Sequence, residues 1–192
     1  MVSHGGADQT MSDLILALDI GGTKLAAGVA SAEDFRRTGR LASIAKEPIP
    51  APGTPQAVLP RAITLARELA QAAKGTIVAI GVSTGGPLDH TTGVVIKFPH
   101  LPGWRNIPLC RELSAALGAP ALLDNDANLG ALAEYRWGAG QGYDSMVYLT
   151  ISTGIGGGVI CRWAAGSWRG LGSRRGRSHQ RRDWWPCLPV RQ

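Results

Sequence analysis

A pair of glycines between two apolar runs limits the possible folds of this chain more than any other feature. The first run, LILALDI over residues 14–20, is continuous rather than alternating, which is typical of a strand buried on both faces. It breaks at Gly21 and Gly22, and the second run, LAAGVA over residues 25–30, is again small and strand-like. A dinucleotide-binding fold would place a helix after the glycines, and none is signalled here. The segment therefore predicts strand, glycine turn, strand.

The residues around this turn also have a chemical interpretation. Adjacent glycines let backbone N–H groups close on an anion, and the cation Lys24 follows Thr23 directly. Asp19, at the end of the first run, can hold a hydrated Mg²⁺. The pattern favours a phosphate-binding turn, and its alternative is an ordinary hairpin with a Gly-Gly turn.

Composition separates the body of the chain from its end. The net charge of the 192 residues is +6, but residues 1–159 carry 12 basic and 13 acidic side chains, whereas residues 160–192 carry eight arginines and one acidic residue. The three cysteines have no metal-ligand spacing, and no stretch has the length of a membrane span or of a signal peptide. We therefore expect a cytoplasmic protein with a nearly neutral body.

The rest of the chain reads as alternating strands and helices. Apolar residues recur at helical spacing over residues 56–74, and a turn-rich loop with Gly85 and Gly86 follows an apolar strand. The expected strands cover residues 41–45, 76–83, 93–98, 121–124, 145–152 and 159–160, and the expected helices cover residues 56–74, 109–117 and 125–137. Two glycine hairpins in this order predict an α/β protein with two related lobes that face one ligand.

Five segments of the chain can be compared with a known family. They are LALDIGGTK (16–24), IGVSTGGPLD (80–89), LPGW (101–104), LLDNDAN (122–128) and TISTGIGGGVI (150–160). In this order they resemble the ROK sugar kinases, a branch of the actin-like ATPase (ribonuclease H-like) fold. The resemblance implies an N-terminal lobe plus an incomplete second lobe. It also implies an ATP- and Mg²⁺-dependent kinase for glucose, N-acetylglucosamine or N-acetylmannosamine, acting at C6, with intact members forming homodimers.

The same resemblance assigns roles to particular residues. Asp126, on a loop that enters a helix, is the expected general base, and its alternative role is helix capping, which Asn125 shares. Asn125 and Asp126 are expected to contact the sugar, with Gly85 and Gly86 close to it. The residues expected to grip ATP are Asp19, Gly21, Gly22, Thr23 and Lys24 from one lobe and Thr153, Gly154, Gly156, Gly157 and Gly158 from the other.

Four other residues have structural interpretations. We expect Asp89 to close a turn rather than bind a metal, and Trp104 and Trp137 to pack rather than stack on a ligand. His100 stands where the family often has Asn, which is either a changed sugar contact or a loop substitution.

The family pattern is expected to end at Ile160. Members continue with Glu-x-Gly-His and a zinc-binding Cys-x-Cys-Gly, whereas this chain continues with eight arginines and four of its six tryptophans. The zinc site is therefore expected to be absent, since Cys161 and Cys187 do not replace it. Read one base later, permitted codons for residues 175–192 can spell both missing motifs, which indicates a shifted reading frame. The competing hypothesis is a nucleic-acid-binding tail.

These observations predict four regions. They are a disordered segment (1–13), an N-terminal actin-like lobe (14–124), the start of a second lobe (125–160) and an aberrant, disordered tail (161–192). A ROK-type sugar-sensing repressor is the alternative function, but 13 residues before Leu14 are too few for a helix-turn-helix domain. With most of the second lobe missing, we expect this chain by itself to be inactive.

Overall fold

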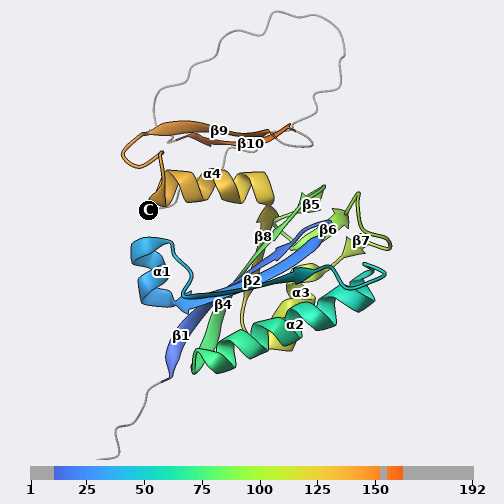
Figure 1. The fold of residues 1–192 in the computed structure, drawn as a ribbon. Helices are drawn as coiled ribbons and strands as arrows, with labels where there is room; N and C mark the ends of the chain where they lie inside the picture. Colours follow the sequence, from blue (N-terminus) through green and yellow to red (C-terminus); the bar gives the residue numbers. More distant parts are fainter. Residues whose placement is uncertain (1–10, 152–154, 162–192) are drawn as a thin grey trace, which may run out of the picture. The chain divides into compact units, whose positions relative to one another are not determined.

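The computed structural model describes residues 11–151 and 155–161 (Figure 1). The chain divides into two compact units between Asp126 and Ala127, two residues after the predicted boundary. Each unit is described by itself. Three predictions fall outside the described residues: disorder before Met11, the turn at Thr153 and Gly154, and the tail after Cys161.

A five-stranded mixed sheet forms the centre of the first unit. Its strand order is β3-β2-β1-β4-β8, with β1 antiparallel to β2 and parallel to β4, and β4 parallel to β8. The strands are β1 (Ser12–Ile20), β2 (Lys24–Ser31), β3 (Ser43–Pro48), β4 (Gly75–Thr84) and β8 (Ala121–Asn125). The predicted strand, glycine turn, strand is confirmed, and β1 begins two residues before the expected start.

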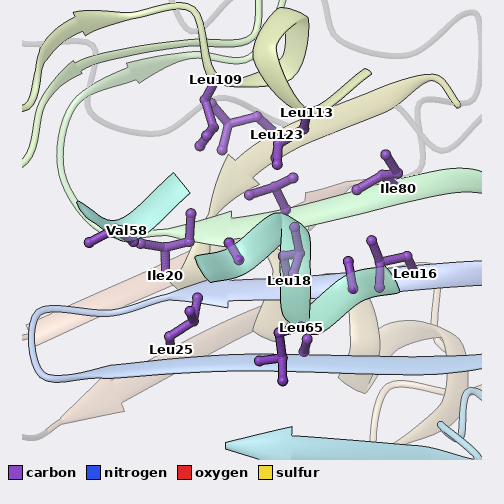
Figure 2. Packing of buried hydrophobic residues seen from close by; sticks show 14 of the residues in the cluster. Leu16, Leu18, Ile20, Leu25, Val58, Leu65, Ile80, Leu109, Leu113 and Leu123 are labelled. Atoms are coloured by element: carbon purple, nitrogen blue, oxygen red, sulfur yellow. The ribbon is translucent and has the colours of Figure 1, made fainter. Parts of the chain in front are cut away.

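Two helices cover one face of this sheet, α2 (Pro55–Ala72) and α3 (Leu109–Leu117) (Figure 1). The stripe of α2 formed by Val58, Ala62, Leu65 and Leu69 is buried, as the helical spacing predicts. Figure 2 shows these helices' side chains meeting those of the strands in one cluster. Fully burying a leucine stabilises a fold by about 1.5–3 kcal/mol, so this layer determines which face of each strand points inward.

The first strand is buried on one face, whereas the sequence predicted burial on both. Leu14, Leu16, Leu18 and Ile20 are buried, while the residues between them are half-buried and Asp19 is exposed. The alternation follows from the two helices, which both pack against the same side of the sheet.

A short helix that the sequence analysis missed, α1 (Ala32–Thr38), follows β2 directly. The Ser31 side chain caps its N-terminus by accepting a hydrogen bond from the Asp34 amide, and Gly39 ends it in the left-handed conformation. Arg37 Nη2 donates to Asp34 Oδ1 at 2.7 Å, and this hydrogen bond holds the pKa of Asp34 below its usual range.

A small three-stranded sheet completes the first unit, with order β5-β6-β7. It consists of β5 (Leu88–Asp89), β6 (Val94–Lys97) and β7 (Arg105–Ile107). Trp104 is 1% exposed and its indole Nε1 donates to the Gly53 carbonyl at 2.9 Å, which confirms its predicted packing role.

The described part of the second unit consists of one helix and one hairpin. Helix α4 (Asp126–Trp137) begins at the last residue of the first unit, and β9 (Ser145–Ile151) pairs antiparallel with β10 (Ile155–Cys161). One face of β9 packs on α4, since the Tyr148 ring lies against Gly130. The other face exposes Val147, Leu149 and Ile151, which are 66%, 59% and 76% exposed. Among the described helices, none is both long and apolar enough to cross a membrane.

Candidate active site

The carboxyl ends of three parallel strands lie next to one another in the first unit. Asp19 of β1 is in register with Ser83 of β4, and Ser83 with Asp124 of β8. One residue further on, Ile20, Thr84 and Asn125 form the next row. Loops that leave the carboxyl ends of parallel strands are where open α/β sheets place their ligands. We call this region the strand-end edge; it comprises these two rows and the residues that follow each strand.

Most of the residues predicted for the first lobe lie at this edge. Each strand is followed there by predicted site residues. These are Gly21, Gly22, Thr23 and Lys24 after β1, Gly85 and Gly86 after β4, and Asp126 after β8. The assigned roles in binding and catalysis remain predictions, but the fold places their residues together although they are more than 100 positions apart in the chain.

The glycine turn leaves two amides available. Gly21 N–H donates to the Lys24 carbonyl at 2.9 Å and closes the hairpin. Within the described residues, the N–H groups of Gly22 and Thr23 have no hydrogen-bond partner. Successive unpaired amides attract anions such as phosphate.

Position 22 has little space for a side chain, although its backbone angle is ordinary. A Cβ atom there would lie 3.2 Å from the Cβ of His100, so the loop after β6 comes close to the turn. This proximity leaves open both interpretations of His100. Gly86 differs, because its φ of +89° lies in the region that side chains disfavour, and a Cβ atom would collide with the Lys97 carbonyl.

Asp19 is exposed at the end of β1, and Ser83 Oγ donates a hydrogen bond to its Oδ1 at 2.8 Å. Sequence reasoning did not identify Ser83. Its place opposite Asp19 depends on β4 pairing with β1 across the intervening β2, α1, β3 and α2, and no local pattern in the sequence reveals that pairing.

The expected general base lies at the junction of β8 and α4. Strand β8 ends at Asn125 and α4 begins at Asp126, so the Asp126 carboxylate belongs to the first turn of a helix, as predicted. Acidic side chains in the first turn of a helix interact favourably with the helix dipole. An ionised carboxylate can accept a proton, which is the property that general-base catalysis requires.

The predicted turn role of Asp89 is confirmed. Its carboxylate accepts hydrogen bonds from the amides of Thr91 and Thr92 and from the Thr92 hydroxyl at 2.8 Å. These bonds, that of the Thr92 side chain above all, hold the pKa of Asp89 below its usual range.

The second glycine segment lies mostly within β10 rather than in a turn. Gly156 and Gly158 pair with Thr150 and Tyr148 of β9. A Cβ atom on Gly158 would lie 2.5 Å from the Cβ of Ala131 on α4, so this glycine lets the strand pack closely on the helix. Contact with ATP phosphates remains a prediction for Gly156, Gly157 and Gly158.

The strand-end edge fits a magnesium nucleotide. Within residues 11–151 and 155–161, no group of three His, Cys, Asp or Glu side chains could hold a metal ion by itself. Mg²⁺ does not need such a group, because it keeps several waters and binds through one or two carboxylates and the substrate's phosphates. Asp19 and the two unpaired amides provide a carboxylate and a phosphate site of this kind.

Comparison with known proteins identifies the family. The ROK family pattern matches residues 15–171, which is most of the chain. The protein belongs to the ROK family. The match continues beyond Ile160, where the sequence analysis ended the family pattern, and it includes the first eleven residues of the expected aberrant tail.

Relatives of this ROK protein include sugar kinases. A glucokinase from Streptomyces coelicolor is 38% identical over 147 residues, which are 77% of this chain and 43% of the relative. The ROK hexokinase from Thermus thermophilus is 43% identical with a TM-score of 0.67, over 77% of this chain and 47% of that one. A Streptomyces griseus glucokinase, solved with glucose and AMPPNP, is 36% identical with a TM-score of 0.64, over 85% and 47%.

These comparisons establish the actin-like ATPase fold of ROK kinases for this chain. The chain spans less than half the length of these three relatives.

Proposed function

We propose that this ROK protein is an ATP-dependent sugar kinase. It transfers the γ-phosphoryl group of ATP to a hydroxyl group of glucose or a related hexose or N-acetylhexosamine, at C6. The observation that carries the proposal is the convergence of Asp19, the Gly22 and Thr23 amides and Asp126 at one edge of the sheet. A structural relative that was solved with glucose and an ATP analogue supports the choice of ligands.

Each group at the edge has a part in the transfer. The Gly22 and Thr23 amides and Lys24 bind phosphate oxygens. Asp19 would hold a hydrated Mg²⁺ ion, which would supply positive charge to neutralise the phosphates. Asn125 orients the acceptor sugar, and Gly85 and Gly86 allow it to approach the backbone.

Asp126 accepts the proton of the acceptor hydroxyl group. As the proton leaves, the hydroxyl oxygen forms a bond to the γ-phosphorus, and the bond from that phosphorus to the ADP oxygen breaks.

The replacement Asp126→Asn tests the base. The amide keeps the size of the side chain but cannot accept the proton, so we expect a loss of about 10²–10⁴-fold in kcat. AMPPNP affinity should not change. Turnover is measured in a coupled ATP and glucose assay on a chain whose tail, including residues 175–192, is translated in the alternative reading frame. AMPPNP binding is measured by calorimetry on the same chain.

Asp89→Asn is the matched control, because it makes the same chemical change in a turn that the transfer does not use. It should keep normal turnover. Near-normal turnover of Asp126→Asn would contradict the assignment of the base. Failure of the restored chain to phosphorylate glucose, N-acetylglucosamine or N-acetylmannosamine would contradict the proposed function itself.

A further inference from the structure

We infer that Ser83 is a positioning residue that orients the Asp19 carboxylate for the hydrated magnesium ion of the bound nucleotide. The inference rests on the proposed function, since it assigns the means by which Asp19 is held ready for that ion. It is carried by the 2.8 Å hydrogen bond from Ser83 Oγ to Asp19 Oδ1 and by the register of the two strands.

The geometry gives Ser83 this position independently of the side-chain rotamer. Strands β1 and β4 are parallel and pair through consecutive residues from Ile15 to Ile20, without a bulge in that stretch. Asp19 and Ser83 are directly opposite, so their side chains leave the same face of the sheet. A serine hydroxyl group there is within reach of the carboxylate, whereas an alanine at this position would provide no donor.

Asp19 depends on this one donor. Within the described part of the chain, Ser83 is the sole side chain that donates a hydrogen bond to the Asp19 carboxylate. An exposed aspartate without such a partner samples several rotamers. The hydroxyl group therefore selects one orientation, and it leaves Oδ2 and the remaining lone pair of Oδ1 for water molecules of a hydrated ion.

The hydrogen bond is better suited to orientation than to stability. It lies on the exposed face of the sheet, where both groups would otherwise bond to water. On the opposite face, the neighbouring residues Ile20 and Thr84 are almost fully buried and join the two strands without help from Ser83. Loss of the hydroxyl group should therefore change the carboxylate and leave the fold intact.

The row continues on the other side of Ser83. Asp124 of β8 is opposite Ser83, so a serine separates two carboxylates along one row of the sheet. A carboxylate can only accept hydrogen bonds, and serine has one proton to donate. The structure directs that proton to Asp19, which distinguishes the two acidic residues.

The test measures how AMPPNP binding depends on Mg²⁺ in the full 192-residue chain. Calorimetric titrations with AMPPNP are made in EDTA and at increasing Mg²⁺ for wild type, Ser83→Ala, Ser83→Thr and Asp19→Asn. Partners of this kind typically contribute 10–100-fold to metal affinity, and we expect Ser83→Ala to raise the Mg²⁺ concentration for half-maximal enhancement about tenfold. Ser83→Thr keeps the hydroxyl group and should behave as wild type. Affinity in EDTA should be the same for wild type and both Ser83 variants.

Ser43→Ala on β3 is the control for removing a serine from the same sheet, and it should have no effect on binding. Thermal unfolding of Ser83→Ala should match wild type, which separates orientation from a general loss of structure. A Ser83→Ala protein with unchanged Mg²⁺ dependence, beside an Asp19→Asn protein that has lost it, would overturn the inference and leave the proposed function standing. Unchanged Mg²⁺ dependence in Asp19→Asn would contradict the role of Asp19 itself and the inference with it.

Discussion

The two glycine hairpins of this ROK protein use their glycines in different ways. In the β1–β2 hairpin, Gly21 and Gly22 lie in the turn, where the Gly22 and Thr23 amides have no hydrogen-bond partner among the described residues. In the β9–β10 hairpin, Gly156 and Gly158 lie within the strand and let it approach α4. Similar glycine-rich sequences therefore solve different physical problems, one of exposing polar backbone and one of packing.

The hairpins also differ in their support. Strand β1 lies at the centre of a five-stranded sheet whose inner face is covered by α2 and α3. In the described chain, β9 pairs only with β10, and one of its faces exposes three apolar side chains. The buried hydrophobic cluster lies in the first unit, so most of the folding free energy of the described residues should reside there.

The largest expected effect comes from the same substitution in both hairpins. Leu16→Ala empties a site that is 0% exposed and should lower the free energy of unfolding by about 2–5 kcal/mol. Leu149→Ala changes a side chain that is 59% exposed and should alter the free energy of unfolding by less than about 0.5 kcal/mol. Urea denaturation followed by circular dichroism measures both. Equal losses would show that the exposed face of β9 is covered in solution.

An intermediate effect is expected when one glycine of each hairpin is replaced by alanine. Gly158→Ala forces a Cβ atom against Ala131 and should destabilise the hairpin of the second unit by about 1–3 kcal/mol. Gly22 has an ordinary φ, and an alanine side chain there meets His100 on an exposed loop that can move slightly. Gly22→Ala should therefore lower the free energy of unfolding by about 0.5 kcal/mol or less. Amide hydrogen exchange in β9 and β10 measures the first change, with the amides of β1 as the internal reference. If Gly158→Ala left exchange in β10 unchanged, the packing role of that glycine would be wrong.

The smallest effect concerns the helix that extends the first hairpin. Arg37→Gln removes the main cause of the lowered pKa of Asp34, so that pKa should rise toward its ordinary value of 3.8. Because the folded pKa is lowered, the stabilisation is present above the ordinary pKa and is lost as pH falls through the folded value. Wild type and variant should therefore differ in stability at neutral pH and converge in acid.

Carbon-detected NMR titration of the Asp34 carboxyl group measures this shift, and Arg40→Gln is a control just beyond the helix. An unchanged pKa of Asp34 in Arg37→Gln would contradict the hydrogen bond on which the prediction rests.

Much of the fold could be predicted from the sequence because its signals are local. The apolar spacing of α2, the break at Gly21 and the strand before Gly85 each depend on residues close in the chain. Helix α1 was missed because its seven residues are too few for a periodic pattern and none is buried. Its capping signals were present in Ser31, the acids Glu33 and Asp34, and Gly39.

The candidate site was predictable in its parts and not in its arrangement. Asp19, Gly22 and Asp126 stand out because each follows an apolar run. The hydrogen bond from Ser83 could not be predicted, because it depends on which strands are neighbours in the sheet. The burial of β1 on one face has the same origin, since the continuous apolar run gives no indication of which side the helices cover.

The two edge strands of the five-stranded sheet, β3 and β8, differ in how well they are protected against pairing with another molecule. On the border strand β3, Lys46 and Pro48 discourage pairing with another chain, and Glu47 is clamped by Arg61 at 2.8 Å. The border strand β8 carries Leu122, which is 75% exposed, and has no proline. At high concentration, two molecules would therefore pair along β8 before β3, and pairing through this one edge would stop at a closed dimer.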